Sequence, residues 1–207
     1  RPGIFAARAA PVQASYLGYP GTLAAPFIDY LVADRVVVPV ECRDDFSEAI
    51  AWLPNGYQAN ASWHPVAAPA LDRAASGLPA DGFVFCSFNN SFKITPDVFA
   101  VWMRLLQRVP RSVLWLIEAN PAAVANLRHQ AEQRGVAGER LVFAPRVQRD
   151  DHLRRHALAD LFVDTFHYGA HTTASDALWT GLPVLTCAGR SFAARVCGSL
   201  LTAVGLP

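Results

Sequence analysis

Residues 166–176, with the sequence FHYGAHTTASD, carry side chains well suited to hold a phosphorylated ligand. They follow a short apolar run, LFVDT, and lead into a pattern typical of a helix. The first N–H groups of a helix lack partners within it, and the helix dipole favours negative charge there. Glycine lets a ligand approach the backbone, histidine and threonine can donate to phosphate oxygens, and aspartate can accept from sugar hydroxyls. The residues concerned are Gly169, Ala170, His171, Thr172, Thr173 and Asp176. We predict a phosphate site here; the alternative is a threonine-capped helix without a ligand.

Two further polar clusters follow strand-like runs in the same way. After FVFCS, the segment FNNSFKITP places Asn89, Asn90 and Lys93 just before a predicted helix. A lysine ammonium suits a diphosphate leaving group, and amides can bond hydroxyls; the alternative is a solvated loop lysine. After RLVFAP, a helix start carries His152 with an arginine on either side at a spacing of three, Arg149 and Arg155. That spacing puts the three side chains along one face of the helix, so they could point into a common cleft. The alternative is an ordinary charged helix surface.

A fourth cluster, AGRSFAARV, offers Ser191 and Arg195 at a later helix start. Its alternative is a capped helix that packs on the sheet. Ligands of open α/β sheets lie beyond the carboxyl ends of the strands, which is where all four clusters are expected. Their coincidence favours a ligand site more than any one cluster does.

Strand-like and helix-like segments alternate from residue 83 onward, as in a parallel sheet with crossover helices. The first helix can begin at Pro96, and its apolar stripe is Phe99, Trp102 and Leu106. Strands are predicted at 83–88, 112–118, 140–145, 161–165 and 183–187, and the other helices at 121–135, at 149–160, after His171 and at 191–205. Short connections between these elements predict a doubly wound α/β half.

Residues 1–80 are less regular. VQASYLG and VVVP predict strands, DDFSEAIAWLP predicts a short helix, and the Pro-rich HPVAAPALDRAASGLP predicts a connection. We interpret residues 1–80 as the end of another α/β domain plus a linker, and residues 81–207 as a Rossmann-like domain, itself expected to be truncated. Both ends look cut, so we expect a fragment.

The composition argues against several classes of protein. Hydrophobic residues make up 52% of the chain and charged residues 17%, which favours a packed globular protein over a disordered one. A net charge of +1 without a basic stripe argues against nucleic acid as a partner. Apolar runs end within about ten residues, short of the roughly twenty that span a bilayer, and no signal peptide opens the chain. Cys42, Cys86, Cys187 and Cys197 lack CxxC spacing, and at least two lie in apolar strand-like runs, so we predict reduced, buried thiols. We expect a cytoplasmic protein with no membrane partner.

Several segments, in order along almost the whole chain, resemble the catalytic region of the O-GlcNAc transferases, in a bacterial-type homologue. They are SYLGYPGTLAAPFIDYLVAD, FCSFNNSFKITP, RDDHLRRHALADLFVDT, GAHTTASDALWTGLPVLT and the late AARV. This family modifies protein serine and threonine with a sugar from a nucleotide donor. The resemblance implies a two-domain GT-B architecture, with the donor UDP-GlcNAc against the C-terminal half and tetratricopeptide repeats ahead of the catalytic region. None of those repeats is visible in this sequence, and no cofactor besides the donor substrate is implied.

The resemblance also assigns residues. Lys93 matches the lysine that contacts the donor diphosphate, and Asn90 stands where the animal enzymes carry glutamine. Arg149 replaces a lysine, whereas His152 and Arg155 match the histidine and arginine near the uridine.

At the later turn, His171, Thr172 and Thr173 match the HTT segment around the diphosphate and sugar, and Asp176 matches the aspartate on the ribose. Tyr168 and Gly169 depart from the animal pattern, so the sugar pocket is expected to differ in shape there. Upstream, two residues of LGYPGT match residues that line the GlcNAc pocket, although glycine and proline there also fit a simple turn. These two are Leu17 and Gly18.

The implied mechanism is inverting transfer, in which an acceptor hydroxyl attacks the anomeric carbon as the bond to UDP breaks. We assign catalysis to Lys93 and His171, because Lys93 and the helix start beside His171 can stabilise charge on the β-phosphate without a metal. No DxD-type metal site is evident, since Asp150 and Asp151 are adjacent on a helix start and point different ways. The family's proposed histidine base lies outside this chain. His64, in SWHP, is a local alternative, although a single histidine in a Pro-rich linker is more often structural.

Two other functions stay open on the sequence. A different GT-B transferase, with another UDP-sugar or another acceptor, would share the fold and the donor face. The chain could also serve only as a nucleotide-sugar-binding or protein-binding module. By itself we expect it to bind nucleotide without catalysis, because one wall of the cleft and any upstream base are missing.

Overall fold

The computed structural model of the chain describes residues 2–61 and 72–206. The chain divides into two compact units, one formed by Arg1–Ala61 with Ala188–Pro207 and the other by Ser62–Cys187. Each unit is built around its own parallel sheet. Within the described residues no helix is both long enough and apolar enough to cross a bilayer.

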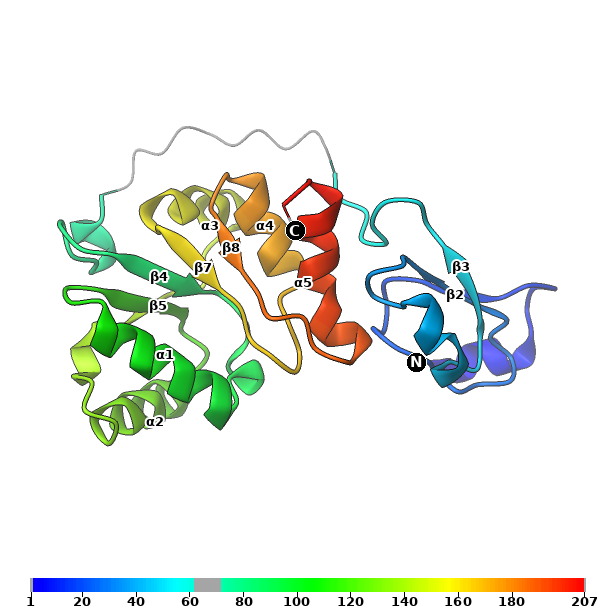
Figure 1. The fold of residues 1–207 in the computed structure, drawn as a ribbon, viewed down its shortest axis with the longest axis horizontal. Coiled ribbons are helices and arrows are strands. Elements are labelled where there is room, and N and C mark those ends of the chain that lie inside the picture. The colour runs from blue at the N-terminus through cyan, green and yellow to red at the C-terminus, as the bar shows by residue number, and fades with distance from the viewer. Residues whose placement is uncertain (1, 62–71, 207) are drawn as a thin grey trace. The chain divides into compact units, whose positions relative to one another are not determined.

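The larger unit, Ser62–Cys187, contains a five-stranded parallel sheet in the order β6-β5-β4-β7-β8 (Figure 1). The strands are β4 (Val84–Ser87), β5 (Val113–Ile117), β6 (Leu141–Ala144), β7 (Leu161–Val163) and β8 (Val184–Leu185). All five strands predicted for this part are confirmed. Counted within the unit, the order is third, second, first, fourth, fifth, so the winding reverses between β4 and β7. In doubly wound sheets the ligand crevice opens at this switch point.

Four α-helices connect these strands: α1 (Pro96–Arg108), α2 (Pro121–Glu132), α3 (Arg149–Arg155) and α4 (Thr172–Trp179). Figure 1 shows α1 and α2 together on one side of the sheet, with α3 and α4 on the other. The predicted stripe of α1 is confirmed, because Phe99, Trp102 and Leu106 are buried in one apolar cluster with β4 and β5. Gly181 has a φ of 78°, which an L side chain rarely adopts, and it follows the end of α4.

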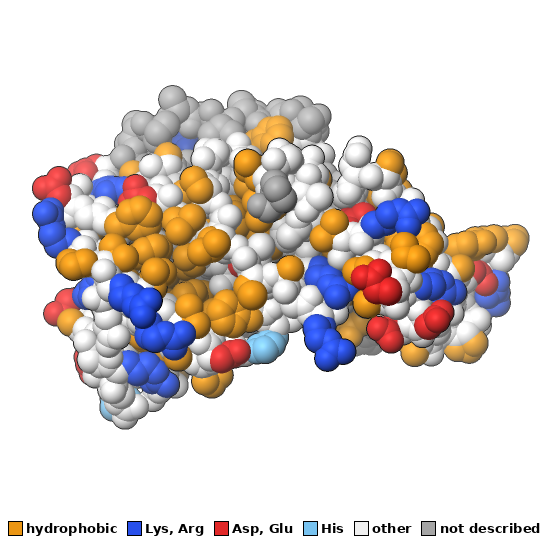
Figure 2. Space-filling view, in the orientation of Figure 1, with side chains coloured by type: hydrophobic (Ala, Val, Ile, Leu, Met, Phe, Trp, Pro, Cys, Tyr) orange, Lys and Arg blue, Asp and Glu red, His pale blue; other side chains and the backbone are white. Residues whose placement is uncertain are grey.

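Short 3-10 helices complete the connections of the larger unit. They are η3 (Ala74–Ser76), η4 (Ser91–Lys93), η5 (Gly138–Arg140) and η6 (His156–Leu158). Figure 2 shows hydrophobic side chains gathered on the face of this unit that is turned to the viewer. Phe83, just before β4, is 37% exposed, and Leu185, at the end of β8, is 58% exposed. Apolar side chains of this unit are therefore not confined to its core.

The smaller unit has three parallel strands in the order β1-β2-β3, with α5 (Phe192–Ala203) and the 3-10 helices η1 (Pro2–Ala7) and η2 (Val40–Asp45). The strands are β1 (Ala14–Ser15), β2 (Tyr30–Ala33) and β3 (Ala49–Trp52). The predicted helix in DDFSEAIAWLP is wrong, because residues 49–52 pair along their whole length with β2. The indole of Trp52 donates to the carbonyl oxygen of Val38 at 3.0 Å, which fixes the end of β3.

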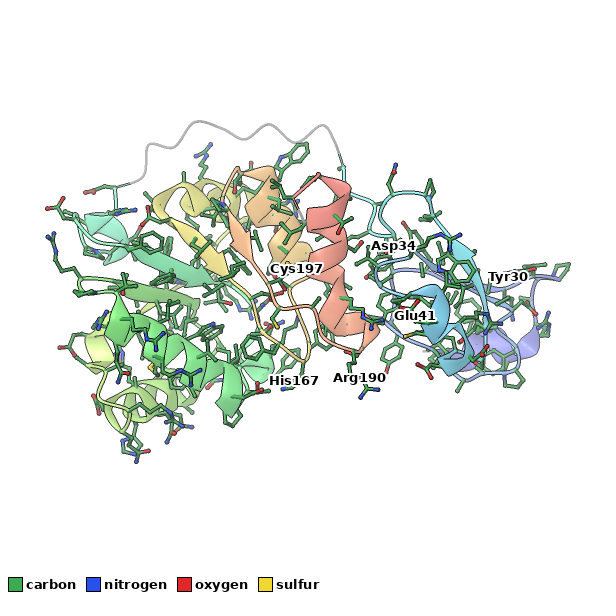
Figure 3. The ribbon with its side chains drawn as sticks, viewed as in Figure 1. Tyr30, Asp34, Glu41, His167, Arg190 and Cys197 are labelled. Carbon is green, nitrogen blue, oxygen red and sulfur yellow. The ribbon has the colours of Figure 1, made fainter. Side chains whose placement is uncertain are left out.

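The predicted strand VVVP is also wrong. β2 ends at Ala33, and the buried carboxylate of Asp34 accepts from the backbone N–H groups of Val36 and Val37 at 2.8 and 2.9 Å. These bonds hold residues 35–38 in a turn. The other carboxylate oxygen of Asp34 accepts from Tyr57 N–H at 2.8 Å and from the hydroxyl of Ser199 at 2.6 Å. Figure 3 labels Asp34 after β2.

Helix α5 is confirmed as a helix, and it packs in the smaller unit. Phe192 and Val196 lie in the apolar cluster that contains Leu31 and Tyr57, and the Tyr57 and Phe192 rings meet edge to face at 5.0 Å. The compact units thus differ from the predicted division at residue 80, because burial of this helix face joins residues 188–207 to the first 61 residues. All four cysteines are free thiols, but the prediction that they are buried holds only for Cys86 and Cys197, since Cys42 is half-buried and Cys187 is exposed.

Candidate functional site

A cleft of about 390 Å³ lies where β4, β5 and β6 end and where α3 and α4 begin. It is lined by Phe88, Asn90, Ile117, Arg146, Val147, Arg149, His152, Arg155, Thr173 and Asp176. Six of these residues come from three separate clusters predicted from the sequence, and the fold brings those clusters together. Three guanidinium groups face one carboxylate in the cleft, so its net charge suits an anionic ligand.

The carboxylate of Asp176 lies between two residues of α3. Arg149 Nη2 is 3.3 Å from Asp176 Oδ1, and His152 Nε2 is 3.9 Å from Oδ2. Asp176 is only 7% exposed, so its orientation is fixed by the surrounding packing. A fixed carboxylate at the wall of a cleft can accept hydrogen bonds from the hydroxyl groups of a ligand.

His152 is an uncharged ring in this cleft. Burial, together with the charge of Arg155, His156 and Arg149, lowers the pKa of His152 to about 3. A guanidinium can only donate hydrogen bonds, so Arg155 donates to Nδ1 of His152. The ring proton of His152 therefore lies on Nε2, the atom that faces Asp176. His152 can therefore donate from Nε2 to a ligand without carrying charge.

Phe88 fixes the side chains beneath the cleft. Its ring lies 5.1 Å from those of Trp115 and His156 and 5.4 Å from that of His152, and the guanidinium carbon of Arg155 lies 4.4 Å from its centroid. Burial lowers the pKa of Arg155 to about 10, so the group stays charged at neutral pH. Arg155 also donates to the carbonyl oxygen of Pro145 at 2.8 Å. These contacts present one rigid cation to the cleft.

The carboxylate of Asp164, directly after β7, organises the next part of the site. Its Oδ1 accepts from the backbone N–H groups of Thr165 and Ala170, both at 2.7 Å, and from the amide of Asn89 at 3.1 Å. Its Oδ2 accepts from the hydroxyl of Thr186 at 2.7 Å. The network thus joins the ends of β4, β7 and β8 and holds the loop that leads into α4.

The amide of Asn89 carries this network to α4. Its oxygen accepts from the hydroxyl of Thr173 at 2.7 Å, while its nitrogen donates to Asp164 and Thr165. Sequence reasoning placed Asn89 in a polar cluster but missed Asp164 and Phe88 as site residues. The position of both directly after a strand was the signal that could have identified them.

Lys93 lies at the end of η4, beside the loop that precedes α4. Its Nζ donates to the carbonyl oxygen of Gly169 at 2.8 Å and lies 4.2 Å from the ring centroid of Tyr168. Burial lowers the pKa of Lys93 to about 8, against the opposing effect of Asp164. The Tyr168 ring also stacks on that of His171, with centroids 5.0 Å apart and planes 21° apart. The ring of Tyr168 therefore contacts both residues predicted to be catalytic, Lys93 and His171.

The other predicted residues fall in different places. Thr172 is the exposed first residue of α4. Leu17 and Gly18 belong to the smaller unit, where Gly18 lines a separate cavity of about 360 Å³. Ser191 and Arg195 also belong to that unit; Ser191 caps α5, and Arg195 donates to the carbonyl oxygen of Gly189 at 2.9 Å.

Other predictions concern the general base and a metal site. His64 lies outside the described residues. Asp150 and Asp151 occupy the first turn of α3, as predicted. Within residues 2–61 and 72–206, no group of three or more His, Cys, Asp or Glu side chains could hold a metal ion.

Residues 1–66 and 59–207 match a sequence family described as glycosyl transferase family 41. The chain belongs to this family. A relative from Arabidopsis thaliana, the probable UDP-N-acetylglucosamine–peptide N-acetylglucosaminyltransferase SEC, is 39% identical over 209 residues, which cover 98% of this chain and 21% of the relative. A relative from Caenorhabditis elegans, named UDP-N-acetylglucosamine–peptide N-acetylglucosaminyltransferase, is 26% identical over an alignment of 315 residues. The alignment covers 99% of this chain and 27% of the relative. This family 41 chain thus spans about a fifth to a quarter of these relatives.

Two solved structures resemble the chain. A mutant of the Thermobaculum terrenum O-GlcNAc transferase superposes with a TM-score of 0.88 at 34% identity, over 98% of this chain and 38% of that one. A sucrose-phosphate synthase from Thermosynechococcus elongatus gives a TM-score of 0.56 at 16% identity, over 86% and 48% of the two chains, and shows likeness of fold alone. The predicted GT-B type of fold and the resemblance to the O-GlcNAc transferases are both confirmed.

Proposed function

We propose that this family 41 chain carries the donor site of an enzyme that transfers N-acetylglucosamine from UDP-GlcNAc to serine and threonine hydroxyls of proteins. The observation that carries the proposal is the arrangement at the switch point of the larger sheet. An arginine-lined cleft, the start of α4 and the ammonium of Lys93 adjoin one another there. The names of the relatives specify the sugar and the peptide acceptor.

The donor fits these surfaces by its chemistry. Neutral His152 and the carboxylate of Asp176 offer a donor and an acceptor to the uridine and its ribose hydroxyls. The diphosphate would lie at the start of α4, where the helix dipole favours negative charge. Thr172 and Thr173 bring hydroxyl groups to the same place, and Lys93 brings the positive charge.

The reaction is proposed to be an inverting displacement. The acceptor hydroxyl attacks the anomeric carbon, the bond between that carbon and the β-phosphate oxygen breaks, and UDP departs with the bonding electron pair. Negative charge develops on the β-phosphate, and fixed donors stabilise it most when they are aimed in advance. Lys93 and the first turn of α4 can supply this stabilisation without a metal ion. The acceptor's proton passes to a general base of the full-length protein, because the histidine that the family resemblance proposes for this role lies outside this chain.

Two assays test the proposal. Calorimetric titration of UDP into the chain, with and without EDTA, should show the same affinity, and a strict requirement for Mg²⁺ would contradict metal-independent binding. Incubation of the full-length protein with radiolabelled UDP-GlcNAc and an acceptor peptide should label serine or threonine. Competition with UDP-glucose, UDP-galactose and GDP-sugars distinguishes this enzyme from another GT-B transferase. Donor binding without any labelling in the full-length protein would favour a binding module instead.

A further inference from the structure

We propose that Tyr168 is a positioning residue whose ring holds Lys93 and His171 in the orientation that receives the donor diphosphate. The inference rests on the proposed function, because it concerns the same diphosphate. It adds a residue that the resemblance does not supply, since Tyr168 departs there from the animal pattern.

The ammonium of Lys93 is held by two contacts. Lys93 is the single lysine of the chain, beside 17 arginines. Its Nζ has three hydrogens, of which one is donated to the carbonyl oxygen of Gly169 at 2.8 Å. The face of Tyr168, 4.2 Å from Nζ, attracts the cation without using a hydrogen-bond acceptor. Hydrogens therefore remain for a phosphate oxygen while the flexible lysine stem is already held.

The ring of Tyr168 is itself held from several directions. The hydroxyl of Thr165 donates to the Tyr168 carbonyl oxygen at 2.7 Å, which fixes the backbone next to the Asp164 network. Phe92 meets the ring edge to face at 6.3 Å, and His171 stacks on it at 5.0 Å. A displacement of Tyr168 would thus disturb both the lysine and the residue that precedes α4.

The ring has a second effect, on solvation. Lys93 is partly buried, and burial is the largest cause of its lowered pKa of about 8; the carboxylate of Asp164 opposes the shift. Removal of the ring opens Lys93 to water, so its pKa should rise toward the ordinary value. At the same time the ammonium loses its fixed position, so UDP should bind more weakly at neutral pH. A general loss of stability would not combine these two changes.

The test compares Tyr168→Phe, which keeps the ring, with Tyr168→Ala and Tyr168→Leu, which remove it. We expect Tyr168→Phe to bind UDP within about twofold of the unaltered chain, and the other two to lose about tenfold, as for one lost cation–π contact. Above pH 8 the affinity of the unaltered chain should decline as Lys93 loses its proton, and this decline should move to higher pH in Tyr168→Ala. Tyr168→Phe is thus the matched control, because it keeps the ring that lies against Lys93 and removes only the hydroxyl.

Direct observation of Lys93 makes the result independent of whether a variant folds. Selective isotope labelling of lysine gives one side-chain NMR signal, which should be shifted upfield by the Tyr168 ring in the unaltered chain. An unshifted signal would overturn the inference, and so would equal affinities and equal pH profiles in Tyr168→Phe and Tyr168→Ala. If UDP binding still required Lys93 in that case, the proposed function would stand. No binding of UDP by the unaltered chain would remove both.

Discussion

The exchange Asp164→Ala tests how the site is held together. The carboxylate is 4% exposed and accepts from two backbone N–H groups, from the amide of Asn89 and from the hydroxyl of Thr186. Its removal leaves three buried N–H donors without that acceptor, and each such donor costs about 1–3 kcal/mol. We expect the free energy of unfolding to fall by about 4 kcal/mol or more, a large share of the stability of a typical domain.

Urea unfolding, followed by tryptophan fluorescence, measures this loss. Asp164→Asn keeps one acceptor oxygen and should cost about 1–2 kcal/mol, whereas Thr186→Val removes a single neutral donor and should cost about 1 kcal/mol. The three variants should therefore rank with the alanine exchange clearly lowest in stability. If Asp164→Ala were no less stable than Thr186→Val, the network would not be what holds the loop before α4.

Lys93→Ala in the full-length protein should lower kcat on the order of a hundredfold or more with little change in stability, as steady-state kinetics at saturating donor and thermal unfolding would show. His156 is fully buried and burial lowers its pKa to about 4, so the folded state binds fewer protons than the unfolded state between that pH and about 6.5. This contribution of His156 to stability should be fully present above pH 6.5 and decrease by about 3 kcal/mol as the pH falls to 4, in addition to the loss from His152, whose pKa is also lowered. Urea titrations in which His156→Gln shows an undiminished pH slope would contradict this. Arg149→Ala should weaken UDP binding in calorimetry but change stability by less than about 1 kcal/mol, because the side chain is half exposed.

The regular half of the fold could be predicted because its local signals agree with one another. α1 begins at Pro96, where a missing N–H costs nothing, and its buried residues recur at helical spacing. The apolar strands end at polar clusters, so the carboxyl edge of the sheet and most cleft residues followed from the same pattern. Local sequence and tertiary packing specify the same structure in this part of the chain.

The N-terminal part could not be predicted as well, because contacts distant in sequence decide its structure. The run of three valines favours a strand by propensity, yet Asp34 holds it in a turn through bonds to Val36 and Val37. That carboxylate is in turn held by Ser199, 165 residues away. Residues 49–52 alternate small and large side chains, and only the neighbouring β2 decides in favour of a strand.

The contacts within the site could not be predicted for the same reason. Asn89 and Asp164 meet because β4 and β7 are neighbours in the sheet, with Phe85 opposite Leu161. The chain passes through two other strands before it returns, so spacing along the sequence does not reveal the pair. The contact between Lys93 and Tyr168 likewise depends on the path of a loop between β7 and α4.

A crystal structure of the chain with UDP tests the central claim most directly. The account predicts the diphosphate within hydrogen-bonding distance of Lys93 Nζ and of the first N–H groups of α4, with the uridine in the cleft beside His152 and Asp176. It predicts the same pose from crystals grown with EDTA. UDP bound away from the carboxyl ends of β4 and β7, or bound there with Lys93 still directed only at Gly169, would contradict it.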